Sequence, residues 1–136
     1  MNALVAAAIV VSLAAQAGVE TIARDSMSNV DAPRQAVAKT QKEWDTLWRQ
    51  HAGDKPAPKI DFTRRMVVAV FLGSRATGGF RVDITGARRD GDKLIVEWRE
   101  QRPDRRDIVA QVLTSPAHLA TVETFDGEVV FQKADQ

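Results

Sequence analysis

The sequence predicts an α+β fold, in which a mostly antiparallel β-sheet carries one amphipathic helix at about residues 40–52. Three observations lead to this fold class. The run Met66–Leu72 is apolar throughout and rich in β-branched residues. Short segments of alternating polarity follow it, and Asp-Gly turns between them favour antiparallel pairing of neighbours. The third observation is an apolar stripe with the i, i+3, i+4, i+7 spacing of a helix: Trp44, Leu47, Trp48 and His51.

The first seventeen residues differ in character from the rest of the chain. They carry no charged side chain, and they end in Ala15-Gln16-Ala17, a small-x-small triplet typical of signal-peptidase sites. The apolar run is shorter than the roughly 20 residues of a membrane-spanning helix. We therefore expect residues 1–17 to be a cleaved signal peptide and residues 18–136 to form a single periplasmic or secreted domain without a stable membrane anchor. The alternative is a buried or interfacial N-terminal helix.

Composition excludes several classes of function. The 136 residues include no cysteine, which removes disulfides, zinc–thiolate sites and thiol nucleophiles. The net charge of +1 comes from 19 basic and 18 acidic residues, and the arginine pairs stand beside acidic residues. A nucleic-acid-binding protein needs an unbalanced basic face, so no nucleic-acid partner is expected.

The expected helix has clear boundaries, whereas the segments before it carry weaker signals. Weak strands are expected near Glu20–Arg24 and Gln35–Ala38. Thr40 and Glu43 have the spacing of a capping box, in which each side chain satisfies a free backbone amide. Gly53 follows the last residue of the apolar stripe, and the prolines after it prevent the helix from restarting.

Strands dominate the second half of the chain. Met66–Leu72 is expected to be a central strand that is covered on both faces. Phe80–Thr85 alternates in polarity and is expected to have one solvated face, and Asp90-Gly91 predicts a hairpin into the next alternating segment. Asp107–Leu113 is expected to be a further strand. Asp126-Gly127 is expected to close a last hairpin, between Ala120–Phe125 and Glu128–Phe131.

The glycine-rich segment Gly73–Phe80 is the most distinctive stretch of the chain. Its glycine spacing resembles the start of a phosphate-binding P-loop, but Gly79 and Phe80 occupy the positions of the required lysine and hydroxyl residue. A strand is expected to follow, where a P-loop needs a helix N-terminus. The segment is therefore interpreted as a loop between strands, whose paired glycines permit a positive φ or a close backbone approach.

The residue types used in catalysis occur without a catalytic pattern. His118 has no acidic or second histidine neighbour at ligand spacing, and His51 ends the helical stripe. Ser115 lacks the Gly-x-Ser-x-Gly elbow of a hydrolase nucleophile. We expect no catalytic residues, no metal site and no cofactor. An enzyme with a site built from scattered carboxylates is the least favoured alternative, and its candidates are Asp61, Asp83, Glu97 and Glu100.

Several landmarks together indicate a family. They are Glu43-Trp44, Leu47-Trp48, Asp61-Phe62, Met66–Leu72, Gly73–Phe80 and Leu113-Thr114-Ser115-Pro116. From about Thr40 to Phe131, the chain resembles the C-terminal domain of the PrcB-type protease-complex subunits, a bacterial extracytoplasmic family. The resemblance implies a small mixed domain in a non-catalytic subunit that associates with a surface protease, and it brings no catalytic residues with it.

Two functional hypotheses follow. The first is an exported, non-enzymatic protein-binding module that serves an extracytoplasmic protease as an accessory, stabilising or inhibitory subunit. The alternative is a binder of a small anionic ligand through the amides of Gly78 and Gly79, together with Arg75. The first hypothesis places the binding residues on two loops: Arg75, Thr77, Gly78, Gly79 and Phe80 on one, and Thr114, Ser115 and Pro116 on the other.

Overall fold

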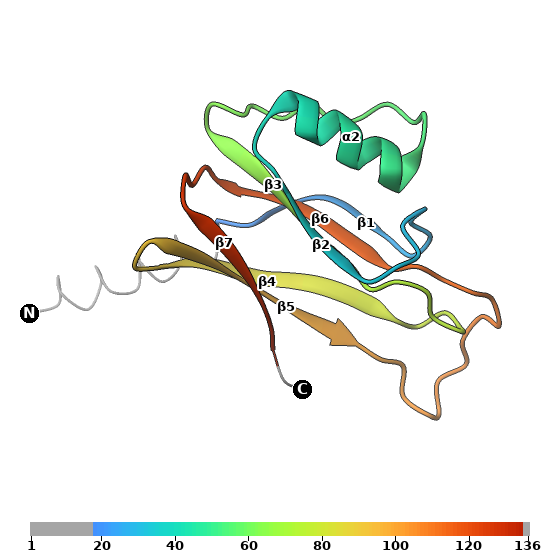
Figure 1. Cartoon of the computed structure of the whole chain (residues 1–136). Coiled ribbons are helices and arrows are strands. Elements are labelled where there is room, and N and C mark those ends of the chain that lie inside the picture. Colours follow the sequence, from blue (N-terminus) through green and yellow to red (C-terminus); the bar gives the residue numbers. More distant parts are fainter. Residues whose placement is uncertain (1–17, 135–136) are drawn as a thin grey trace, which may run out of the picture.

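A computed structural model describes residues 18–134, so the expected signal peptide lies outside the described residues. In the described part, seven strands and one helix form an α+β domain, which confirms the predicted fold class (Figure 1). The elements, in chain order, are β1 (Glu20–Asp25), β2 (Arg34–Ala38), α2 (Gln41–Ala52), β3 (Arg65–Phe71), β4 (Arg81–Asp90), β5 (Lys93–Gln101), β6 (Ala117–Glu123) and β7 (Glu128–Lys133).

The strands form two sheets rather than one. A four-stranded sheet has the order β1-β6-β3-β2, and a three-stranded sheet has the order β4-β5-β7. Helix α2 covers one face of the four-stranded sheet and the three-stranded sheet covers the other, so the domain has three layers (Figure 1).

Strand β3 shows why the layers form. Because side chains alternate between the two faces of a strand, a continuously apolar strand needs a cover on each side. Val67, Ala69 and Phe71 pack in a cluster with Trp44 and Leu47 of α2. The residues of the other face, Met66, Val68, Val70 and Leu72, pack in a second cluster with side chains of β4 and β5. The expectation of a central strand buried on both faces is confirmed.

The helix begins and ends as predicted. The Thr40 hydroxyl accepts a hydrogen bond from the Glu43 amide at 3.1 Å, and the Glu43 carboxylate accepts one from the Lys39 amide at 2.8 Å. Trp44 is fully buried, and its indole N–H donates to the Pro58 carbonyl. Trp48 is half-buried and donates its indole N–H to a carbonyl of the loop that follows α2. Trp44 is therefore the main aromatic anchor of the helix.

The predicted last hairpin is wrong. β6 pairs with β1 and β3, whereas β7 runs parallel to β5 in the other sheet. A two-residue Asp-Gly hairpin turn needs a positive φ at its glycine, and Gly127 does not have one, unlike Gly91 in the confirmed β4–β5 hairpin. The backbone of Gly127 instead approaches the Asp92 carbonyl and the Phe125 ring so closely that a Cβ atom would clash. The connection therefore carries the chain from one sheet to the other.

The predicted strand at Asp107–Leu113 is also wrong. Residues 102–113 connect β5 to β6 without regular secondary structure, and in Figure 1 they project from the body of the domain. A strand needs a neighbouring strand to satisfy its backbone. Among residues 18–134, the backbone of this segment is bonded to another segment only at Ala110, whose carbonyl accepts the Gly78 amide at 2.8 Å. β4 also begins at Arg81, so Phe80 belongs to the preceding loop.

Candidate functional site

The two loops predicted to carry binding residues lie side by side. Arg75 and Thr114 form an antiparallel bridge, in which each amide donates to the other's carbonyl at 2.8 and 2.9 Å. The Thr114 hydroxyl, in a side chain that is almost fully buried, donates to the Thr77 carbonyl at 2.9 Å. The structure thus brings together residues that are about forty positions apart in the sequence. We call segments 26–28, 73–80, 102–113 and 114–116 the loop cluster.

The second loop of the cluster holds its neighbours in place through the backbone. The Ser115 amide donates to Ser26 O at 2.8 Å, and Ser115 O accepts from the Ser28 amide at 2.9 Å. Pro116 is fully buried, and its carbonyl accepts a hydrogen bond from the Leu72 amide at the end of β3. Ser115 and Pro116 are therefore structural members of the cluster, since their polar backbone atoms are already bonded within the chain.

Arg75, which was predicted to be a binding residue, is instead bonded within the domain. Its side chain is 25% exposed, and its Nε donates to a carboxylate oxygen of Glu100 at 3.0 Å. Its Nη1 donates to Leu72 O and Ser74 O, and its guanidinium lies 5.7 Å from the centre of the Phe80 ring. Arg75 therefore connects the glycine-rich loop to the end of β5.

Glu100 is the buried partner of Arg75, and the sequence did not indicate this pairing. Its side chain is only 3% exposed and also contacts Lys133 at 3.4 Å and Arg102 at 3.9 Å. Burial favours the neutral acid, but the hydrogen bonds and charges of Arg75 and Lys133 hold the pKa of Glu100 below its usual value. The Glu100 carboxylate is thus ionised, and its charge is stabilised by the neighbouring cations. We therefore interpret Glu100 and Arg75 as a structural ion pair.

The two consecutive glycines are shaped by the segment that covers them. Gly79 has a φ of 90°, and a Cβ atom there would lie 2.8 Å from both Pro103 and Val109 side-chain atoms. The Thr77 hydroxyl is also bonded locally, to Gly78 O at 2.9 Å. The Gly78 amide is bonded to Ala110 O, and Arg75 is bonded to Glu100, so two of the three groups proposed to bind an anion already have partners within the domain. These contacts weigh against the anion-binding alternative.

The sequence analysis did not anticipate that exposed large hydrophobic side chains lie on segments of this cluster. Large hydrophobic side chains are exposed at four places in the described chain: Met27 (59%), Ile108 (102%), Val112 (53%) and Leu113 (71%). Three of them lie in segment 102–113, and Met27 forms a backbone bridge with Ser115 beside it. We call these four residues the apolar patch. A sequence signal existed, because Asp107–Leu113 contains β-branched residues shortly before Pro116, but this segment was interpreted as a further strand.

A serine, a histidine and a carboxylate do meet near the helix end. Ser28 Oγ lies 2.7 Å from His51 Nδ1, and Asp25 Oδ2 lies 3.8 Å from His51 Nε2. The Ser28 hydroxyl is buried and also accepts the Val30 amide. Burial lowers the pKa of His51, and the Asp25 charge opposes this only in part. A nucleophile must be exposed to its substrate, whereas Ser28 is buried. The hydrogen bond between Ser28 and His51 instead fixes the loop after β1 to the end of α2.

His118 joins the two sheets. Its Nδ1 accepts the backbone N–H of Ile84 in β4 at 2.8 Å, which leaves the ring proton on Nε2, 2.9 Å from the Thr21 hydroxyl. Burial, reinforced by the charge of Arg24, lowers the pKa of His118 to about 4. The ring is therefore neutral near pH 7 and acts as a hydrogen-bonded connection between layers.

The scattered carboxylates do not face one another. Asp83, which was expected on a solvated face, is buried and contacts Arg24 at 2.7 Å and Arg81 at 3.1 Å. Glu97 contacts Arg88, and Glu100 contacts Arg75. Asp61 accepts hydrogen bonds from Thr63 in an exposed turn. Within residues 18–134, no three His, Asp or Glu side chains gather closely enough to hold a metal ion. No helix of that range is long and apolar enough to cross a membrane.

The fold defines a small three-layer α+β domain, whose distinctive surface is a cluster of loops. Residues 66–123, slightly less than half of the chain, match the family model described as PrcB C-terminal. The resemblance found in the sequence is thus confirmed for a PrcB C-terminal-like domain over a narrower range than Thr40–Phe131. The matched range contains segments 73–80, 102–113 and 114–116 of the loop cluster. Searches of curated proteins and of solved structures find no match.

Proposed function

We propose that this chain is an exported, non-enzymatic protein-binding module and an accessory subunit of an extracytoplasmic protease, which it stabilises or inhibits. The observation that carries the binding role is the apolar patch. Exposed large hydrophobic side chains that gather on one set of loops are typical of protein-interaction sites, whereas isolated ones need no explanation. The patch lies on loops that a three-layer scaffold holds in place, an arrangement common among binding surfaces.

The kind of partner is suggested by the family match. A PrcB C-terminal-like domain favours association with a protease complex. The apolar N-terminal stretch ending in Ala15-Gln16-Ala17 supports export, because it has the length and the last residues of a cleavable signal peptide. The partner would then be an exported protease that presents an apolar depression for Ile108 and Leu113.

Affinity capture from the envelope fraction of the natural host tests the binding role. The full chain is expected to recover an exported protease, and the double change Ile108→Ser and Leu113→Ser is expected to lose it at an unchanged melting temperature. Ala57→Ser is the matched control, because Ala57 is exposed on the segment between α2 and β3. Equal recovery of the protease by both variants would show that the apolar patch does not contribute to the interface. Recovery of no protease by the wild type would overturn the proposed partner.

Intact-mass measurement tests export separately. Protein purified from the natural host is expected to begin at Gly18, since signal peptidase cleaves after small residues such as Ala17. A mature protein that retains Met1 would contradict the proposal of a cleaved signal peptide.

A further inference from the structure

Strand β2 is an outer strand of the four-stranded sheet. It pairs with β3 from Arg34 opposite Phe71 to Ala38 opposite Val67, and no described strand pairs with its other edge. An outer strand presents a row of backbone N–H and C=O groups in the plane of the sheet. Another extended chain can add to such an edge by backbone hydrogen bonds, with its side chains supplying specificity.

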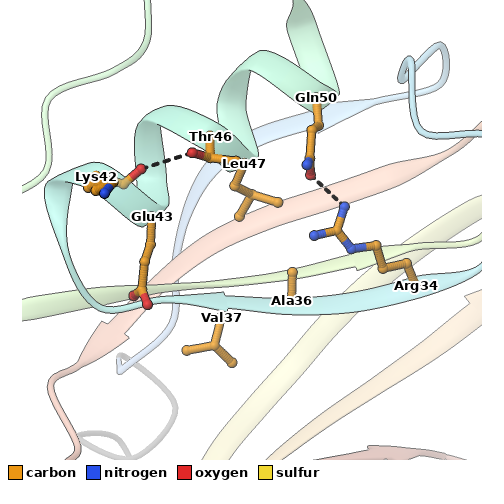
Figure 2. Close-up of a pocket in the computed structure, with 8 residues that line it drawn as sticks. All are labelled: Arg34, Ala36, Val37, Lys42, Glu43, Thr46, Leu47 and Gln50. Carbon is orange, nitrogen blue, oxygen red and sulfur yellow. Dashed lines mark hydrogen bonds between the residues drawn. The ribbon is translucent and has the colours of Figure 1, made fainter.

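A groove of about 300 Å³ lies between this strand and helix α2 (Figure 2). Ala36 points toward the helix and Val37 away from it, because neighbouring side chains of a strand alternate between faces. Leu47 points from α2 toward the sheet, so the inner part of the groove is apolar. The groove stays open there because the Ala36 side chain is small. The full set of lining residues is Arg34, Ala36, Val37, Lys42, Glu43, Thr46, Leu47 and Gln50.

Cations stand at both ends of the groove. At one end, Arg34 donates to the neutral side chain of Gln50 at 2.6 Å, and Lys42 lies toward the other end (Figure 2). No carboxylate among residues 18–134 lies within ion-pair distance of Arg34 or Lys42. The carboxylate of Glu43 accepts the Lys39 amide and belongs to the helix cap. The groove thus offers two cations without ionic partners beside a short apolar centre.

We propose that β2 is a docking edge for an extended acidic segment of a partner protein, which adds to the four-stranded sheet as a fifth strand. The occupant would be about five residues long, since that length matches β2. Its side chains that face α2 are small and apolar, to fit beside Ala36 and Leu47. Its carboxylates lie near Arg34 and Lys42, because charge complementarity selects the partner and sets its register. This surface is separate from the apolar patch, so the proposal does not depend on the proposed protease.

The test uses the full chain labelled with ¹⁵N and a short capped peptide of alternating glutamate and valine. Strand addition is expected to slow hydrogen exchange at outward-facing amides of Arg34–Ala38, because these amides gain hydrogen-bond partners. A lysine–valine peptide of the same length is expected to leave these amides unchanged. Slowed exchange at residues 102–113 in place of β2, or equal protection by both peptides, would overturn the proposal.

A charge exchange makes the test specific to the groove. The double change Arg34→Glu and Lys42→Glu is expected to weaken binding of the acidic peptide by about ten-fold or more and to allow the lysine–valine peptide to bind. Lys59→Glu is the matched control, because Lys59 has no ion pair among the described residues and lies beside β1, at the opposite edge of the same sheet. Unchanged binding of the acidic peptide to the double variant would refute the proposal. Protection of β2 in a dimer without peptide would identify a second copy of the chain as the occupant and would equally refute it.

Discussion

β3 and residues 107–113 both contain β-branched residues but have opposite surroundings. Both contain β-branched residues in strand-like runs, and the sequence pattern predicts a strand for each. β3 has a strand on both edges and an apolar layer on both faces, and every residue of Met66–Phe71 is buried. Ile108 in the other segment is fully exposed. Strand propensity therefore shows only that a segment can adopt a β-conformation. Whether the segment becomes part of a sheet depends on whether a neighbouring strand is available to pair with it.

The difference separates apolar residues that stabilise the domain from apolar residues that are available to a partner. Removing a side chain from β3 leaves a cavity and lost contacts, both of which destabilise the fold. Removing one from the apolar patch takes away surface that already contacts water. Stability measurements on matched substitutions in the two regions can therefore test this difference.

The largest effect is expected for Phe71→Ala. Phe71 is 1% exposed and packs between β3 and α2, so its truncation is expected to reduce the free energy of unfolding by about 3–5 kcal/mol. Urea or guanidinium denaturation of the full chain measures this loss. A loss below about 1 kcal/mol would show that the α2 layer does not pack on the sheet as described.

A second effect concerns the connection between the sheets and depends on pH. The pKa of His118 is about 4 in the folded protein, against an ordinary value of 6.5, so between these values the unfolded chain binds more protons than the folded chain. The stability contributed by neutral His118 is complete above about pH 6.5 and is lost as the pH falls through 4. The expected loss is on the order of a few kcal/mol.

Thermal or denaturant unfolding at a series of pH values tests this prediction. His51 also has a lowered pKa, so the comparison with His118→Gln is needed to isolate the His118 contribution. The variant is expected to be less stable at pH 7 and to lose less stability on acidification than the wild type. Identical pH profiles for the two proteins would mean that the ring is not held neutral between the sheets.

Local patterns predicted the elements whose causes are local. The helix follows from its cap at Thr40 and its apolar stripe, and the β4–β5 hairpin follows from Asp90-Gly91, where Gly91 has a φ of 62°. The parallel pairing of β5 with β7 depends on a connection that leaves one sheet for the other, and no short-range signal encodes it. The expectation of a final hairpin failed because Asp126-Gly127 has the composition of a tight turn but not its backbone conformation.

The same distinction applies to the candidate site. The sequence singled out the two loops that hold Arg75 and Thr114, but their contact is a long-range bridge that no pattern reveals. Glu100 was one of four carboxylates that the sequence was unable to pair, and its burial beside Arg75 depends on the ends of β5 and β7. The apolar patch was not predicted because the exposure of a side chain depends on which segments pack against it. The composition of a segment does not reveal these neighbours.

A smaller effect than those of Phe71 and His118 is expected for Arg75→Gln. An exposed arginine would be replaced without measurable cost, but this one is bonded to Glu100, whose side chain is 3% exposed. Glutamine leaves the buried carboxylate with Lys133 and Arg102 alone, and the expected loss is about 1–3 kcal/mol at pH 7. Chemical denaturation of the single variants and of the double variant Arg75→Gln with Glu100→Gln measures the coupling. Additive losses would show that the two groups do not interact.

The smallest effect is expected for Ile108→Ser, and its matched substitution is Val68→Ser in β3. Both changes replace a β-branched aliphatic side chain with serine, but Val68 is fully buried and Ile108 is fully exposed. Surface substitutions usually change stability by less than about 0.5 kcal/mol, so Ile108→Ser is expected to keep the wild-type midpoint of denaturation. Val68→Ser is expected to lose at least about 2 kcal/mol, because it adds an unsatisfied hydroxyl to a cavity. A loss above about 1 kcal/mol for Ile108→Ser would place this side chain in a packed environment in solution. Repeating the measurement at several protein concentrations would then identify its cover, since a midpoint that rises with concentration indicates a second copy of the chain.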